Sequence, residues 1–303
     1  MTGSRHLPLH GIDALWPWCV ALAQARRAGT PPPAAFMPAG AAPLRHTDGL
    51  GWQLDLPGEP VWDDAASELF ALLKPLLDRP AGGTPWVLGQ LGQSLNGCIA
   101  TGSGDANFVN GPEVLTHLHR LRALSDAVIV GAATAALDDP QLTTRRVPGP
   151  NPVRVLLDPG LGLAPTLKAL ADRQAPTLLV CDATRAADAA RRVGADQVLA
   201  VPGLLDARGA MRMAPLLAAL HARGLSVLFV EGGGVTVSRF LAQSCMDRLH
   251  LSVAPVVIGG GRPGLQLPAA GRMRDCPRPA ARVFNLGQDV LWDLDLRAEA
   301  GAD

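Results

Sequence analysis

The sequence lacks the charge excess that marks many binding proteins. Its 303 residues carry 27 basic and 27 acidic side chains, so the formal net charge is zero. Surfaces that bind nucleic acid or an acidic membrane are usually strongly basic. We therefore expect no nucleic-acid partner and no membrane partner, and a small neutral or anionic ligand is favoured.

Cysteine and lysine are also scarce. The five cysteines are scattered and form no Cys-x-x-Cys pair, so neither a zinc site nor a disulfide framework is indicated, and a reducing cytoplasm fits. Lysine occurs only at Lys74 and Lys168. A site that needs a lysine amine therefore has two candidates.

Long apolar runs are missing as well. No stretch approaches the ~20 residues that cross a bilayer, and the N-terminus lacks the charged start, apolar segment and cleavage site of a signal peptide. The chain has no Gly-x-Ser-x-Gly motif, so nucleophilic hydrolysis is not indicated. We predict an unexported, cytoplasmic protein.

The first part of the chain differs in composition from the rest. It holds four of the six tryptophans, a proline-rich stretch over 30–43 and helix-like segments at 11–28 and 60–78. A segment rich in glycine and proline over 79–85 reads as a linker. We predict a small N-terminal extension over 1–80, which is a lid, a dimerisation arm or a packing extension, and a second domain over 85–297.

From residue 85 onward, short apolar runs alternate with helix-like segments. This pattern predicts an α/β domain with a largely parallel sheet covered on both faces. The last two strand-like runs, 282–285 and 289–296, have no helix between them and are expected to form an antiparallel edge. The other predicted strands are 86–91, 127–130, 153–157, 177–180, 197–200, 226–230 and 248–257, and the predicted helices are 112–124, 166–172, 184–193, 212–223 and 235–244.

The segment 227–241 is the most informative, because it runs from an apolar strand through Glu231 and three glycines into a helix. Glycines let a ligand approach the backbone, and the free N–H groups and dipole of a helix start favour an anion. A tight packing corner would have the same pattern. Other polar, glycine-containing segments follow predicted strands at 90–97, 131–145 and 255–264, and ligands of such sheets collect at these strand ends. Together they favour a ligand site.

Several charged residues near these strand ends are candidates for chemistry. Asp138 and Asp139 are adjacent, and on an extended segment one at most would face a ligand. His117 and His119 are two apart on a predicted helix, which makes a poor metal pair. Arg122 and Arg145 have forked guanidinium groups that match a phosphate, although a surface salt bridge would explain them equally well.

At these residues the chain resembles the reductase domain of the bifunctional riboflavin-biosynthesis deaminase/reductase, which has a dihydrofolate-reductase-like fold. The resemblance covers about 85–296 and rests on ordered pieces: 94–100 (SLNGCIA), 119–123 (HRLRA), 126–131 (DAVIVG), 138–145 (DDPQLTTR), 231–233 (EGG) and 254–263 (APVVIGGGRP). The N-terminal region lacks the His-x-Glu and Pro-Cys-x-x-Cys signature of the zinc deaminase. The resemblance therefore implies the reductase domain alone.

In that family NADPH delivers a hydride to C1′ of a ribosylamino-pyrimidine 5′-phosphate and opens the ribose. The resemblance implies a homodimer and NADPH as cofactor, with NADH not excluded. Glu231 and Asp138 are the implied catalytic residues, either of which could assist the proton that ring opening needs. The implied substrate-binding residues are Arg122, Leu142, Arg145 and Glu231, with the arginines on the phosphate. The implied cofactor-binding residues are Gly92, Phe108, Gly131, Thr134, Asp138, Gly232, Gly233, Gly234, Val235, Thr236, Val237, Ser238 and Arg239.

The chain departs from the family pattern at several of these positions. The family's lysine is Gln90, the aspartate of its Ser-Leu-Asp-Gly is Asn96, and its common tryptophan is Phe108. Ala106 replaces a substrate-contacting serine, and Pro159 stands where a serine often meets the 2′-phosphate of the cofactor. Two alternatives stay open: a reductase of a different pyrimidine or pterin-like molecule, and a non-catalytic ligand-binding or interaction protein that kept the fold.

Overall fold

A computed structural model describes residues 9–31, 44–54, 62–106 and 109–297. The chain divides between Gly83 and Thr84 into two compact units. The sequence predicts the linker at the same place, over 79–85. Most of the proline-rich stretch, and Phe108, lie outside the described residues.

The N-terminal unit consists of two helices and a two-stranded antiparallel sheet. Its elements are α1 (Ile12–Ala28), β1 (Arg45–Thr47), β2 (Gly51–Gln53) and α2 (Asp64–Leu77). Helix α1 ends at Gly29, whose left-handed φ of 63° a glycine adopts without strain. Helix α2 begins after Asp63, whose carboxylate accepts from the Ala66 N–H at 2.7 Å. The helix-like segments at 11–28 and 60–78 therefore form helices, the second from Asp64 onward.

The second unit follows the predicted alternation of strands and helices. Its strands are β3 (Trp86–Ser94), β4 (Cys98–Ala100), β5 (Ala127–Gly131), β6 (Val153–Leu157), β7 (Thr177–Asp182), β8 (Val198–Val201), β9 (Val227–Glu231), β10 (Arg248–Ala254), β11 (Arg262–Pro263), β12 (Ala280–Leu286) and β13 (Asp289–Asp295). Its helices are α3 (Pro112–Leu124), α4 (Ala132–Asp138), α5 (Lys168–Ala171), α6 (Ala186–Val193), α7 (Met213–His221) and α8 (Gly234–Ala242). The short elements β4, β11 and α4 are not expected from the sequence.

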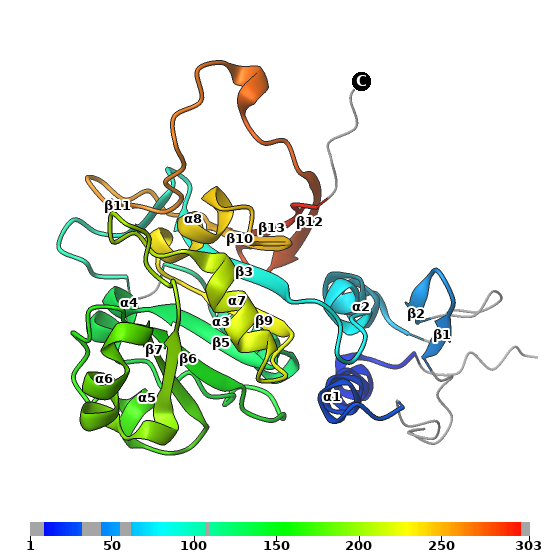
Figure 1. Cartoon of the computed structure of the whole chain (residues 1–303). Helices are drawn as coiled ribbons and strands as arrows, with labels where there is room; N and C mark the ends of the chain where they lie inside the picture. Colours follow the sequence, from blue (N-terminus) through cyan, green and yellow to red (C-terminus); the bar gives the residue numbers. More distant parts are fainter. Residues whose placement is uncertain (1–8, 32–43, 55–61, 107–108, 298–303) are drawn as a thin grey trace, which may run out of the picture. The chain divides into compact units, whose positions relative to one another are not determined.

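Nine strands form one sheet in the order β12-β13-β10-β3-β9-β5-β6-β7-β8 (Figure 1). The seven neighbouring strands β10, β3, β9, β5, β6, β7 and β8 pair in parallel. At one edge, β13 pairs antiparallel with β10, and β12 pairs antiparallel with β13. The predicted α/β class, the largely parallel sheet and the antiparallel edge are thus confirmed. A separate antiparallel pair joins β4 to β11.

The two faces of the central strands carry different residues because side chains alternate along a strand. On β9, Leu228 and Val230 enter the apolar core that includes Leu216 of α7 and Phe240 of α8. Glu231 lies on the opposite face, where its carboxylate meets Arg122 of α3. The carboxyl ends of β3, β5, β6 and β9 therefore converge between α3 on one face and α8 on the other.

The fully buried Arg154 of β6 ties the sheet to two loops. Its guanidinium donates to Thr177 Oγ1 at 2.8 Å, to the Ala175 carbonyl at 2.7 Å and to Asp172 Oδ1 at 2.7 Å. A further contact of 3.3 Å reaches the carbonyl of Gln141. The hydrogen bonds to a carboxylate and to several oxygens make burial of this charge tolerable.

We predict that Arg154→Ala lowers the free energy of unfolding by about 3–5 kcal/mol, because it leaves the Asp172 carboxylate and three other acceptors without their donor. Arg191 of α6 is exposed and pairs with Asp188, so Arg191→Ala is the matched control, with an expected change within about 0.5 kcal/mol. Urea unfolding of both variants measures the difference. Equal stabilities would mean that the Arg154 network contributes nothing.

Candidate active site

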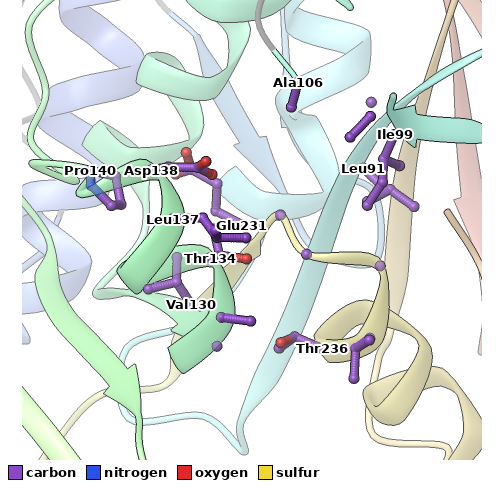
Figure 2. A pocket seen from close by; sticks show the side chains of 18 of the residues that line it. Leu91, Ile99, Ala106, Val130, Thr134, Leu137, Asp138, Pro140, Glu231 and Thr236 are labelled. Carbon is purple, nitrogen blue, oxygen red and sulfur yellow. The ribbon is translucent and has the colours of Figure 1, made fainter. Parts of the chain in front are cut away.

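A cavity of about 870 Å³ lies where the carboxyl ends of the parallel strands meet. Its wall comes from β3, β4, α3, β5, α4, β6, β9, α8 and β11, as well as from the loops after β4, α4, β6, β8 and β11. Figure 2 shows Asp138 of α4 and Glu231 of β9 in one part of the pocket, with Thr134 nearby and Ala106, Leu91 and Ile99 at other parts of the wall. This is the position at which open α/β sheets bind ligands.

The glycine turn between β9 and α8 forms one side of the cavity. Gly232 and Gly233 have φ angles of 69° and 71°, which glycine alone adopts without strain. A Cβ at Gly234 would overlap the Gly264 carbonyl oxygen, so the loop after β11 lies directly against the start of α8. The turn lines the cavity with backbone that carries no side chains, and such a turn can hold the diphosphate of a dinucleotide.

The β9–α8 turn interlocks with the turn between β5 and α4. A Cβ at Gly131 would overlap Thr236 Oγ1, and a Cβ at Gly233 would lie 2.5 Å from Thr134 Oγ1. Each turn thus uses a glycine to admit the threonine of the other. The two turns are positioned as one unit, which explains why two of the predicted cofactor segments share a wall.

A row of polar side chains crosses the sheet beneath α3. In the strand register, Asp293 of β13 is opposite His250, His250 is opposite Gln90, and Gln90 is opposite Glu231. Gln90 and Glu231 line the cavity, and Gln90 Nε2 contacts Ser252 Oγ at 3.4 Å. The register alone therefore places two polar side chains side by side at the cavity wall.

Helix α3 contacts this row through His117 and Arg122. His117 Nε2 lies 2.9 Å from His250 Nδ1, and burial lowers the pKa of both imidazoles, which favours their uncharged forms. Burial by itself would raise the pKa of Asp293, but the adjacent His250, 3.4 Å away, and the hydrogen bonds from Arg248 hold it well below its ordinary value. The predicted separation of His117 from His119 agrees with their different neighbours.

Arg122 of α3 binds Glu231 rather than facing the cavity. Its Nε donates to Glu231 Oε2 at 2.7 Å, its Nη2 donates to Glu231 Oε1, and its Nη1 donates to the Thr143 carbonyl at 2.9 Å. The fork is therefore occupied on both prongs. The sequence pairs these two residues as neighbours of one substrate, whereas the structure shows that they hold each other.

The loop after α4 is held in place by α3. His119 Nδ1 accepts from the Arg145 N–H at 2.8 Å, which requires a neutral ring. Burial, together with the nearby Arg122 and Arg145, lowers the pKa of His119 to about 4. Leu142 lines the cavity and has a left-handed φ of 56°, a conformation that costs an apolar residue energy. The loop is held in this conformation by the His119–Arg145 hydrogen bond and by the hydrogen bond from Arg122 to the Thr143 carbonyl.

Asp138 and Asp139 have different environments. Asp138 ends α4 and lines the cavity. It is exposed at the mouth, yet the surrounding protein partly shields its carboxyl, and this desolvation raises its pKa. Asp139 is the left-handed cap of the helix, and its carboxylate accepts from the Lys168 N–H at 2.8 Å. One aspartate faces the cavity as predicted, but the expected extended segment is wrong, because a helix ends there.

The structure brings most of the predicted site residues to one cavity. Those that line it are Gly92, Gly131, Thr134, Asp138, Leu142, Glu231, Gly232, Gly233, Gly234, Val235, Thr236 and Arg239. Those that do not line it are Arg122, Arg145, Val237 and Ser238. The buried Val237 packs into the apolar core, and Ser238 Oγ accepts from the Gln266 N–H at 2.8 Å. Arg145 is exposed, and its Nη1 donates to Thr143 Oγ1 at 2.7 Å.

Some residues of the wall are not identified by sequence reasoning. Asn110 lies against Gly92, where a Cβ would overlap its amide, and it donates to Asp289 Oδ1 at 3.1 Å. Arg262 and Gln266 come from the segment after β10. The glycines at 259–261 signal a loop near the site, but nothing in the sequence separates Arg262 from the other arginines.

Two negative observations apply to the described part of the chain. No helix there is both long and apolar enough to span a membrane. No cluster of three or more histidine, cysteine, aspartate or glutamate side chains in that part could hold a metal ion.

Comparison with known proteins connects the site to a family. Residues 85–274 match the family described as the RibD C-terminal domain. The chain is 32% identical over 223 residues to the 2,5-diamino-6-ribosylamino-4(3H)-pyrimidinone 5′-phosphate reductase of Methanothermobacter thermautotrophicus, covering 70% of this chain and 99% of that protein. It is 30% identical to the riboflavin biosynthesis protein RibD of Aquifex aeolicus, but spans only 56% of that protein's length.

A solved structure has the same fold. It is a diaminohydroxyphosphoribosylaminopyrimidine deaminase/5-amino-6-(5-phosphoribosylamino)uracil reductase from Thermotoga maritima, with a TM-score of 0.61 and 23% sequence identity. The alignment covers 79% of this chain and 64% of that one. The fold that the resemblance implies is thereby confirmed.

We predict that Gly131→Ala lowers the free energy of unfolding by about 1–3 kcal/mol, because the added methyl displaces the Thr236 hydroxyl. In a chain that already carries Thr236→Ala, the change Gly131→Ala should cost much less, because the hydroxyl that the methyl displaces is gone. Thermal unfolding of the four proteins of this cycle measures the coupling.

Gly160→Ala is the control, because a Cβ at Gly160 meets nothing within 4 Å. Additive effects of the Gly131 and Thr236 changes would contradict the interlocked turns.

Proposed function

Because the chain belongs to the RibD C-terminal domain family, we propose that it is a nicotinamide-dependent reductase of a ribosylamino-pyrimidine 5′-phosphate in riboflavin biosynthesis. The observation that carries the proposal is the match over 99% of a relative that bears this reductase name. The carboxylates of Asp138 and Glu231 and the glycine turn also line one cavity. We assign the reaction to residues 85–297 and regard residues 1–80 as an accessory extension.

The residues of the cavity fit a dinucleotide. The turn over 232–234 has no Cβ, and it leads into the N-terminus of α8, so its backbone can approach a diphosphate. Thr134, Thr236 and Arg239 line the same side. A bound NADPH would supply the hydride. NADH is a second candidate, because Pro159, which lines the wall, has no hydroxyl to donate to a 2′-phosphate.

The reaction needs one hydride and one proton. C1′ of the ribose gains the hydride, the bond from C1′ to the ring oxygen breaks, and that oxygen gains the proton. Asp138 is suited to donate this proton because desolvation raises the pKa of its carboxyl. Both oxygens of Glu231 accept from Arg122, so we assign Glu231 to substrate binding and orientation, as an acceptor for the sugar or amino groups of the substrate.

The substrate ring is the least constrained part of the proposal. Gln90 lines the cavity with a neutral amide in place of the family's lysine, and Ala106 lines it in place of a serine. These two replacements make a related heterocycle the second candidate for the substrate, after the pyrimidine of the named relatives. The homodimer stays a prediction. Val283 of the edge strand β12 and Trp292 of its neighbour β13 are paired in register and exposed, and the molar mass in solution tests it.

The purified protein should oxidise NADPH, followed at 340 nm, when the ribosylamino-pyrimidine 5′-phosphate is added. We predict that Glu231→Gln lowers kcat/KM about a hundredfold, because it removes a substrate acceptor and leaves the Arg122 charge without its carboxylate. Glu113→Gln, on the exposed start of α3, is the control and should stay near wild type.

Binding of NADPH without oxidation would favour the second substrate or a non-catalytic role. Absence of binding by either dinucleotide would rule out the enzyme.

The rate should also depend on pH through Asp138. A proton donor must be protonated, so kcat/KM should fall as pH rises above the pKa of Asp138, which lies above its ordinary value of 3.8. In Asp138→Asn the rate should be lower and this decline should disappear. The Asp139 carboxylate contacts Lys168, so Asp139→Asn should retain the decline of the rate with pH. An unchanged profile in Asp138→Asn would assign the proton to another group.

A further inference from the structure

Arg262 reaches the cavity from a segment that the resemblance assigns to no ligand. It begins β11, which pairs with β4 at Ala100, and it lines the cavity. Its guanidinium lies against Gly104, where a Cβ would sit 2.7 Å from Nη2. Gly104 also has a φ of 99°, which glycine adopts without strain. A residue with a Cβ at this position would therefore be strained and would also displace the Arg262 side chain.

The backbone that follows Arg262 packs on the start of α8. A Cβ at Gly234 would overlap the Gly264 carbonyl oxygen and would lie 3.1 Å from the Pro263 carbonyl. Two residues further on, the Gln266 N–H donates to Ser238 Oγ at 2.8 Å. Arg262 thus directly precedes the two residues that contact the helix start, where an anion is favoured, and it lines the same cavity.

The charge of Arg262 is not neutralised within the described part of the chain. Neither a hydrogen bond nor an ion pair is formed there by its guanidinium, and the same holds for the Arg239 side chain, the other arginine of the cavity wall. By contrast, Arg122 and Arg248 bind carboxylates through both prongs of their forks. A guanidinium at a cavity wall without a carboxylate is suited to bind an anionic ligand.

We propose that Arg262 binds the diphosphate of the dinucleotide, opposite the backbone N–H groups at the start of α8. This inference rests on the proposed function, because it names a contact of the same cofactor. The diphosphate is favoured over a terminal phosphate because Arg262 is next to Pro263 and Gly264, which touch the first residue of α8. The guanidinium and the helix start then act on one anion from two sides.

The test is direct binding of NADPH, NADH and ribose 5-phosphate to the wild-type chain, Arg262→Ala and Arg262→Lys, measured by calorimetry. Arg262→Ala should raise the Kd of both dinucleotides by a similar factor, about tenfold to a hundredfold, because a charge-assisted contact is lost. Arg262→Lys keeps the charge without the fork and should lose less. The Kd of ribose 5-phosphate should stay within about twofold of wild type.

Arg278→Ala is the matched control, since Arg278 is an exposed arginine of the same C-terminal region that does not line the cavity. It makes the same change in net charge and should leave all three Kd values near wild type. If Arg262→Ala is too unstable to measure, Arg262→Lys and Arg262→Gln supply the comparison, and melting temperatures report their folding.

Other outcomes overturn the inference in different ways. A loss for NADPH alone would place Arg262 at the 2′-phosphate, and a loss for ribose 5-phosphate alone would place it at the substrate. Unchanged binding with a lower melting temperature would make Arg262 only a contact of the Gly104 loop. Failure of the wild-type chain to bind either dinucleotide would instead refute the proposed function, before any variant is compared.

Discussion

The contact between the Arg122 guanidinium and the Glu231 carboxylate joins three parts of the chain at the cavity. It links α3 to the end of β9, and the third donor of the same guanidinium fixes the carbonyl of Thr143 in the loop after α4. A buried arginine without its carboxylate would be costly, so each member of the pair constrains the other. The position of α3 over the sheet, the direction of Glu231 and the path of the Leu142 loop therefore depend on one interaction.

This arrangement changes how the charged residues divide the work. An arginine with both prongs occupied has little to offer a phosphate, and Arg145 does not line the cavity either. The cavity's cationic groups are instead Arg239 and Arg262, together with the start of α8. Among the acids, Glu231 is held as an acceptor, whereas Asp138 has the raised pKa that suits a donor. The resemblance implies that either carboxylate could assist the proton, and the structure gives the two different environments.

The departures from the family pattern do not all have the same meaning. Asn96 does not line the cavity: its Oδ1 accepts from the Ile258 N–H at 3.0 Å and its Nδ2 donates to the Ile258 carbonyl at 2.8 Å. Only an amide can make both contacts, so this residue joins the β3–β4 turn to the loop after β10. Gln90 and Ala106, by contrast, line the wall. The question of substrate specificity therefore concerns these two positions and not Asn96.

The sequence by itself determined the architecture and most of the segments that line the cavity. Alternating apolar strands and helices predicted the parallel sheet, the last two runs predicted its antiparallel edge, and glycines after strands marked the segments that meet at the cavity, because these signals are local. Only the tertiary structure decided which side chains face the cavity. The strand register set Gln90 beside Glu231, the fold turned Arg122 onto Glu231, and the packing of the 262–266 segment on α8 brought Arg262 to the wall. Such contacts join residues that are far apart in the sequence, by 28 positions for Gln266 and Ser238 and by 109 for Arg122 and Glu231, and no local pattern encodes them.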